Sequence, residues 1–192
     1  MTYEPKTFDI PELTGISRAS IDEHMKLYQG YVKHVNLIHE KIDVLSKDIE
    51  TNSYDIAELQ RRLGFEWGGM RNHEYYFAQF EGGPKELPDG PLKEKIEAQW
   101  GDVATWLTRF KTIASTRGVG WAMLYHDPQT GNLLQTWVDE QHLGQLVDLD
   151  LILGLDMWEH SYMLDVPPSR KKEYVDNFFA NINWEVVANR LS

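Results

Sequence analysis

Two long stretches of helical periodicity fill the first part of the chain and restrict the folds open to it. Apolar residues recur every three or four positions from residue 18 to 49. A second such stretch starts near Ser53 and Asp55, either of which can cap a helix, and runs to the helix-ending sequence Gly82-Gly83-Pro84. Two long helices with a short connection predict an antiparallel hairpin.

The second half of the chain changes to a mixed pattern after a proline-rich linker at residues 84–91. We therefore predict an N-terminal helical hairpin domain, residues 1–83, and a C-terminal α/β domain, residues 84–192. The fold class is α+β with a small sheet. Within the second domain the pattern predicts a helix, three strands and three short helices: residues 92–116; 118–125, 133–138 and 149–155; and 158–165, 169–181 and 184–190.

The composition excludes several classes of protein. A formal net charge of −11 argues against general nucleic-acid binding, which needs a basic surface. The chain has no cysteine, which excludes disulfides, thiolate zinc sites, iron–sulfur clusters and cysteine nucleophiles. It lacks an apolar run of about 18 residues and begins without a basic and apolar signal peptide, so we expect a cytoplasmic protein with no membrane contact.

Asp156 and His160 mark the end of a predicted buried strand. The run 149–155 before them is mostly apolar, as expected for a strand that carries polar residues at its C-terminal end. An Asp and a His four residues apart can converge on one point, along a helix face or at a strand-to-helix corner. A buried aspartate needs a charge partner or several hydrogen bonds, and a metal ion would satisfy both residues.

Two of the seven histidines offer further metal ligands. His24 falls on the apolar stripe of the first helix, and His73 lies among aromatic residues of the second. Added to the Asp and His above, they give three imidazoles and one carboxylate, a set that suits iron or manganese as well as zinc. The alternative is that His24 and His73 hydrogen-bond each other or backbone carbonyls in an aromatic core. Three other histidines are expected to be solvated: His34, His39 and His126.

The segment Asp156-Met157-Trp158-Glu159-His160 resembles a known signature. It matches the Asp-x-Trp-Glu-His motif of the iron/manganese superoxide dismutase family. The chain is similar to that family over nearly its whole length, with further matches at Asn72-His73, Gly118-Val119-Gly120-Trp121 and Asn183-Trp184-Glu185. This resemblance implies that the three strands of the C-terminal domain form an antiparallel sheet.

The resemblance also implies a metal centre with a redox activity. Four residues would bind one iron or manganese ion per subunit, with solvent as a fifth ligand: His24, His73, Asp156 and His160. The ion would cycle between two oxidation states and convert superoxide into O2 and hydrogen peroxide. An anionic Asp156 suits this chemistry because it helps to stabilise the higher oxidation state. Two alternatives stay open: another oxygen or peroxide reaction at the same metal, and a binding module without enzymatic activity.

The residues around the implied metal depart from the family pattern. Members usually have a tyrosine eight residues after the first ligand histidine, with a further histidine between them. Here Tyr31 lies seven residues after His24, and the intermediate histidine is absent. Seven residues at about 3.6 per turn return to nearly the same face, so we expect Tyr31 to act as the gateway residue on a regular helix. The alternative is that Tyr28 takes the polar role and Tyr31 only packs.

A glutamine usually hydrogen-bonds the metal-bound solvent in this family. Iron-type members supply it from the second helix, at the position that Gly69 occupies here. Manganese-type members have a glycine there and take the glutamine from the loop after the second strand, where this chain has Gln141 followed by His142. The combination favours manganese, with His142 in place of Gln141 as the alternative. Trp121 and Trp158 would wall the site and exclude bulky reductants.

By the same resemblance, Glu159 has a role in assembly. It would reach across a subunit interface to His160 of the partner subunit, with Tyr162 nearby. The resemblance therefore predicts a homodimer or a tetramer formed through this region. The alternative is a solvated carboxylate, favoured at a helix start by the helix dipole. Arg170 would guide anions or anchor the interface.

Overall fold

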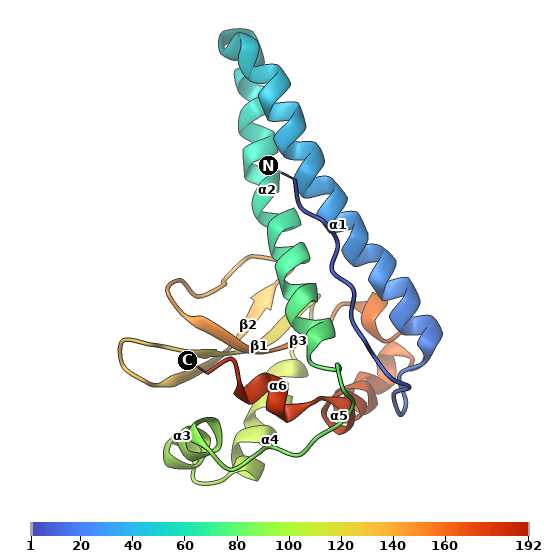
Figure 1. The fold of residues 1–192 in the computed structure, drawn as a ribbon, viewed down its shortest axis with the longest axis vertical. Coiled ribbons are helices and arrows are strands. Elements are labelled where there is room, and N and C mark those ends of the chain that lie inside the picture. Colours follow the sequence, from blue (N-terminus) through green and yellow to red (C-terminus); the bar gives the residue numbers. More distant parts are fainter. Residues whose placement is uncertain (1, 192) are drawn as a thin grey trace.

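Two long antiparallel helices form an arm that stands on a body of one sheet and several short helices (Figure 1). The computed structural model describes residues 2–191. Helices α1 (Arg18–Leu45) and α2 (Ile49–Ala78) are joined by the 3-10 helix η1 (Ser46–Asp48), which confirms the predicted hairpin. At about 1.5 Å per residue, the two helices are about 42 and 45 Å long. No helix within residues 2–191 combines the length and the apolar character needed to cross a membrane.

The bounds of α2 differ from the prediction. The helix begins earlier, because the Asp48 side chain accepts a hydrogen bond from the Thr51 N–H and caps it. It also ends earlier, at Ala78. The residues that follow form turns, and only then do Gly82 and Gly83 adopt positive φ angles of 75° and 77°. The double glycine therefore redirects the chain after the helix rather than ending the helix itself.

The single helix predicted over residues 92–116 is two helices, α3 (Pro91–Trp100) and α4 (Val103–Ala114). Gly101 ends α3 with a φ of 93°, a conformation that favours glycine. Asp102 then caps α4, where its side chain accepts a hydrogen bond from the Thr105 N–H. Apolar residues lie on both sides of the break, so periodicity alone did not reveal it.

The three strands form one antiparallel sheet in the order β2-β1-β3, as the resemblance implied. Strand β1 (Gly120–His126) lies in the middle and is buried along its whole length. It pairs with β2 (Leu133–Asp139) on one side and with β3 (Asp150–Asp156) on the other. In this register Trp121 of β1 lies opposite Asp156, the last residue of β3. The sheet thereby places a tryptophan beside the aspartate of the signature.

Strand β3 is an edge strand, and its free edge is buried against α2 and the C-terminal segment. Gln79 closes this edge: its Nε2 donates to the Gly154 carbonyl at 2.8 Å, and its Oε1 accepts from the Gly154 N–H at 3.0 Å. Two residues earlier on the strand, the Ile152 carbonyl accepts from Arg190 at 2.9 Å. A buried edge needs such partners, because unpaired backbone groups away from water are costly.

Four helical segments complete the body after β3. They are η2 (Glu159–Ser161), η3 (Pro168–Arg170), α5 (Lys171–Asn181) and α6 (Trp184–Ala188). One continuous core joins them to the hairpin and the sheet, and its largest fully buried side chains come from all parts of the chain, among them Tyr28, Tyr76, Phe77, Trp106, Trp121 and Phe178. The proposed division of the chain between residues 83 and 84 stays a prediction.

The histidines predicted to be solvated have different environments. His34 is exposed and His39 is half-buried. His126 is only 5% exposed, so its predicted solvation was wrong. It closes the central strand β1, whose faces are both covered, and its Nδ1 lies 3.4 Å from Asp150 on the neighbouring strand. The turn that follows is exposed, but the position of the strand within the sheet determines the burial of His126.

Candidate metal centre

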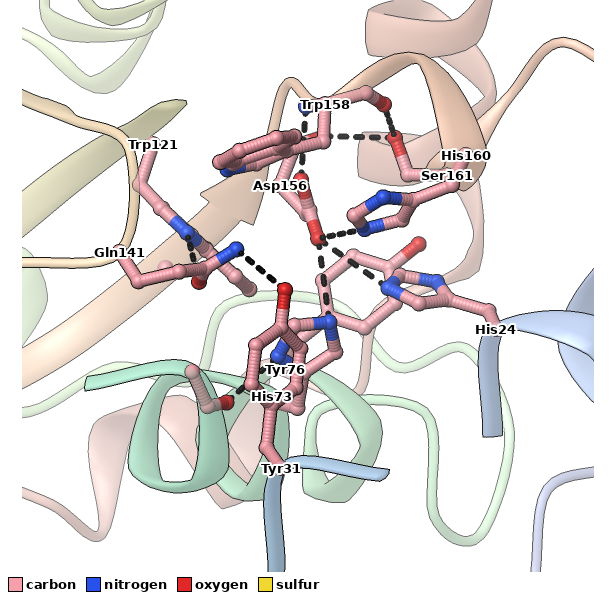
Figure 2. Close-up of polar contacts among 12 residues, drawn as sticks. His24, Tyr31, His73, Tyr76, Trp121, Gln141, Asp156, Trp158, His160 and Ser161 are labelled. Atoms are coloured by element: carbon pink, nitrogen blue, oxygen red, sulfur yellow. Dashed lines mark hydrogen bonds and ion pairs between the residues drawn. The ribbon is translucent and has the colours of Figure 1, made fainter. Parts of the chain in front are cut away.

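The structure brings the four predicted ligands together at the junction of hairpin and sheet (Figure 2). His24 comes from α1, His73 from α2, Asp156 from the end of β3 and His160 from η2. The Asp156 Oδ2 atom lies at the centre, 3.1 Å from Nε2 of His24, 3.2 Å from Nε2 of His160 and 3.5 Å from Nε2 of His73. One ligand atom from each residue lies within 4.8 Å of the others.

The corner after β3 fixes the orientation of the carboxylate. Met157 still donates its N–H to the Gly120 carbonyl, at 2.9 Å, and then the chain turns. The Trp158 N–H donates to Asp156 Oδ1 at 2.7 Å, and the Ser161 hydroxyl donates to the Asp156 carbonyl at 3.1 Å. One carboxylate oxygen is thus used by the turn, and the other faces the three imidazoles. The strand-to-helix corner, one of the two geometries considered from the sequence, is the one observed.

His73 has the form that a metal ligand requires. Its Nδ1 lies 2.6 Å from the Gly69 carbonyl, which can only accept, so Nδ1 carries the proton. Its Nε2 therefore presents a lone pair towards Asp156. This atom is buried and forms no hydrogen bond with any residue between 2 and 191. A buried acceptor without a donor is costly, and a cation in the centre would satisfy it.

The charges of the cluster also suit a cation. Burial, followed by the proximity of His24, lowers the pKa of His73 to about 3, and burial lowers the pKa of His24. Both imidazoles are thus held neutral, as metal binding requires. Burial alone would raise the pKa of Asp156, but the nearby His160 and His24 outweigh it and hold that pKa well below its usual range. Asp156 forms no ion pair with lysine or arginine in the described chain, so a fully buried carboxylate lacks a permanent positive partner.

A chain of hydrogen bonds runs beside the cluster. Trp121 Nε1 donates to Gln141 Oε1 at 3.0 Å, and Gln141 Nε2 donates to the Tyr31 hydroxyl at 3.0 Å (Figure 2). Gln141 is fully buried, and the Tyr31 ring lies 5.1 Å from the His73 ring between centroids. Burial raises the pKa of Tyr31, so its hydroxyl keeps its proton. Because this hydroxyl accepts from Gln141, its own proton is free to be donated elsewhere.

Gly69 gives Tyr31 the space it occupies. A Cβ atom at Gly69 would lie 2.4 Å from the nearest Tyr31 ring carbon, far inside contact distance. Helix α1 is regular from Arg18 to Leu45, so the seven-residue spacing from His24 brings Tyr31 to the site without a bulge. The space needed at this glycine, which the sequence left open, is that of the Tyr31 ring.

The alternative residues lie outside the cluster. The Tyr28 hydroxyl accepts from the Lys6 N–H at 2.8 Å and donates to Glu74 Oε1 at 3.3 Å. His142 is not among the four clustered residues and packs edge-on against Phe65, with 5.9 Å between ring centroids. The Arg170 side chain is exposed and lies 3.5 Å from Glu173.

The two tryptophans flank the cluster from different elements. The Trp121 ring is fully buried and meets His73 edge-on, with 5.2 Å between centroids. The Trp158 ring stacks on His160, with centroids 5.6 Å apart, and its Nε1 donates to the Glu140 carbonyl at 3.1 Å. These contacts place apolar surface on two sides of the four ligand atoms.

Known proteins are similar in sequence to nearly the whole chain that forms this site. Residues 88–190 match the family model described as iron/manganese superoxide dismutases, C-terminal domain. An enzyme named superoxide dismutase [Fe] from Cupriavidus metallidurans is 33% identical over 100% of this chain and 98% of its own length. Enzymes with the same name from Aquifex pyrophilus and Saccharolobus solfataricus are 33% and 31% identical, covering 97% and 92% of this chain and 90% and 85% of their own lengths. The similarity therefore extends over both the hairpin and the sheet that carry the four ligands.

Proposed function

Because the chain belongs to the iron/manganese superoxide dismutase family, we propose that it converts superoxide to O2 and hydrogen peroxide at the four-ligand cluster. Its residues would hold one iron or manganese ion per subunit: His24, His73, Asp156 and His160. The observation that carries the proposal is the convergence of three imidazole nitrogens on Asp156 Oδ2, at 3.1 to 3.5 Å.

The chemistry divides between the ion and the chain. A bound ion supplies a one-electron couple, so that two superoxide anions and two protons become one O2 and one hydrogen peroxide. Anionic Asp156 offsets positive charge and favours the higher oxidation state. The two neutral imidazoles of His24 and His73 add ligands without adding charge.

The residues beside the cluster would hold the proton supply and limit access. The Tyr31 hydroxyl, which accepts from Gln141, keeps its proton pointing away from the glutamine. Gln141 in turn is oriented by the Trp121 indole, so the three groups form one preorganised donor chain. Trp121 and Trp158 cover two sides of the cluster and would exclude reductants larger than superoxide.

Metal identity is the finer part of the proposal. The loop position of Gln141 and the absence of a side chain at Gly69 support manganese. The relatives named above carry iron in their names and give no support to that preference. Expression with both metals supplied, followed by elemental analysis, decides the point. We expect more manganese than iron per chain, and more iron than manganese would overturn the preference.

The activity itself is tested on the purified, metal-loaded chain. We expect about one iron or manganese ion per chain and metal-dependent removal of superoxide. A chain that stays below stoichiometric metal after supplementation would contradict the proposal. A loaded chain that oxidises a donor with hydrogen peroxide but leaves superoxide unchanged would favour the other redox reaction considered from the sequence.

Replacing Tyr31 with phenylalanine is expected to slow turnover. The change removes only the hydroxyl that accepts from Gln141, at 3.0 Å. We expect a loss of about fivefold, the equivalent of one hydrogen bond of about 1 kcal/mol. The matched control is Tyr28→Phe on the same helix, whose hydroxyl faces Lys6 and Glu74 and whose loss should leave turnover unchanged. Unchanged turnover and azide inhibition in Tyr31→Phe would remove the gateway role.

The surface around η2 supports the predicted subunit contact. Glu159 is exposed, and its carboxylate forms no hydrogen bond or ion pair within residues 2–191. His160 is 21% exposed, with its Nε2 turned inwards to Asp156. Two exposed apolar side chains lie close by in the chain, Met163 at 51% and Leu164 at 62%. We propose that Glu159 accepts from the outer nitrogen of His160 of the partner subunit, which makes the smallest assembly a dimer.

Glu159→Ala is expected to weaken that dimer. The variant loses the carboxylate that would pair with the imidazole of the partner subunit, and it should shift towards monomer at micromolar concentration in size-exclusion chromatography with light scattering. Glu97→Ala, at an exposed position of α3, is the control and should stay dimeric. A wild-type chain that elutes as a monomer would directly contradict the proposed dimer.

A further inference from the structure

We propose that Asn72 is a positioning residue that fixes the loop carrying Gln141, and thereby sets where the Gln141 carboxamide stands between Trp121 and Tyr31. The inference rests on the function proposed above, and it concerns residues that the sequence motif did not explain. Asn72 directly precedes His73 but points elsewhere, because successive helical residues are about 100° apart. It is 2% exposed.

The Gln141 backbone is clamped against α2. Asn72 Nδ2 donates to the Gln141 carbonyl at 2.9 Å. One turn earlier, Gly68 leaves the gap in which this carbonyl lies, since a Cβ atom at Gly68 would stand 2.1 Å from the Gln141 oxygen. The other end of the Asn72 amide is also used: its Oδ1 accepts from Gln145 Nε2 at 2.9 Å. Asn72 therefore bridges both sides of the loop.

The backbone of the neighbouring residue, Glu140, shows why this loop needs contacts that hold it in place. Glu140 has a φ of 51°, a conformation that is uncommon for residues other than glycine and is held only by its surroundings. Its N–H donates to the Val119 carbonyl at 3.0 Å, and its carbonyl accepts from Trp158 Nε1 at 3.1 Å. These bonds fix the loop on the sheet side. Asn72 and Gly68 fix it on the helix side, at the next residue.

The consequence is that one rigid helix carries both a metal ligand and the support for the hydrogen-bond chain. A loop that moved away from α2 would displace the Gln141 amide from two partners that each lie 3.0 Å away. Small displacements of such groups have large effects on reactions that depend on their position. Asn72 thus acts on the site through Gln141, without touching the four ligands.

The test compares Asn72→Asp with Gln145→Ala in the metal-loaded full-length chain. Asn72→Asp keeps the shape and the acceptor for Gln145 but replaces the donor to the Gln141 carbonyl with a second carboxylate oxygen. We expect about a tenfold change in the azide dissociation constant, read by optical titration, and faster hydrogen exchange in residues 139–145. Gln145→Ala removes a longer contact of the Gln145 Nε2 with the Gln141 carbonyl, at 3.4 Å, but leaves the 2.9 Å bond from Asn72 in place, so it should keep the azide constant within about twofold of the wild type.

A double variant distinguishes an effect of Asn72 on the position of Gln141 from a general increase in the flexibility of the loop. If Asn72 acts through Gln141, Asn72→Asp should have no further effect on azide affinity in a Gln141→Ala background. Additive effects, or equal effects of Asn72→Asp and Gln145→Ala, would overturn the inference. These outcomes depend on anion binding, so they are distinct from a failure of the proposed function, which would show as missing metal or missing dismutation.

A second route reaches the same carbonyl without changing Asn72. Gly68→Ala pushes directly on the Gln141 backbone, whereas Gly64→Ala, one turn away, meets only the His142 side chain, at 3.2 Å from its Cδ2 atom. We expect Gly68→Ala, and not Gly64→Ala, to reproduce the azide shift. This pair keeps the inference testable if Asn72→Asp does not fold, and equal azide constants for the two glycine variants would count against it.

Discussion

Asp156→Ala is expected to abolish metal binding and, with it, superoxide removal. The variant deletes the atom on which three imidazole nitrogens converge, at 3.1, 3.2 and 3.5 Å. Loss of a residue that only supports a ligand typically costs about 10- to 100-fold in metal affinity or activity, so loss of the sole anionic ligand should exceed about 100-fold. Elemental analysis and a superoxide assay on the same preparation measure both effects.

A control must show that the loss of metal in Asp156→Ala does not come from misfolding. Asp156 Oδ1 also accepts from the Trp158 N–H, so alanine leaves that group without its partner. Asp156→Asn keeps the shape and an acceptor but removes the negative charge, and we expect it to fold and to lose most of its metal. Asp150→Asn, at the other end of the same strand, should retain both metal and activity. Wild-type metal content in Asp156→Ala would refute the assignment of the site.

Gln79→Ala is expected to give a large loss of stability without touching the metal ligands. Gln79 is fully buried and satisfies both backbone groups of Gly154 on the free edge of β3. Leaving each group unpaired costs about 1–3 kcal/mol, so we expect the free energy of unfolding to fall by about 2–6 kcal/mol. Urea unfolding at equal metal content measures the loss.

Gln99 offers a closely matched control. It bonds the two backbone groups of Leu133 in the same way, with Nε2 to the carbonyl at 2.6 Å and Oε1 to the N–H at 2.9 Å. Its own side chain is exposed, so water can replace it. Gln99→Ala should therefore cost less than about 1 kcal/mol. Equal losses in the two variants would show that burial of the sheet edge is not what makes Gln79 important.

Much of the fold was predictable because its signals are local. Helical periodicity in residues 18–83 was enough for the hairpin, and the apolar run before Asp156 was enough for a buried strand. Helix ends were less predictable, since Asp48 and Ser53 are both suitable caps and the sequence pattern does not choose between them. The burial of His126 depends on its strand being central in the sheet, which no short window of sequence shows.

The four ligands of the site were more predictable than the residues that surround them. The signature pairs Asp156 with His160 within five residues. His24 and His73 stood out by their positions on apolar or aromatic helix faces, and the family resemblance then implied them as ligands. The contacts around them join residues far apart in the chain. Asn72 donates to the Gln141 carbonyl, which lies 69 residues further along the chain, and Gly68 leaves the space for that carbonyl. The adjacent glycines at 68 and 69 were the one visible signal, and each turned out to face a different neighbour.

The convergence of the four ligands also has a topological consequence. They come from both helices of the arm, from the end of the sheet and from the segment after it. An ion held there would tie the first helix to a segment near the C-terminal end, closing a long loop of chain. In a sequence with no cysteine, it would take the place of a disulfide cross-link between arm and body. Because the four ligands span residues 24 to 160, metal uptake would report that the arm and the sheet have come together, and unfolding would have to release the ion.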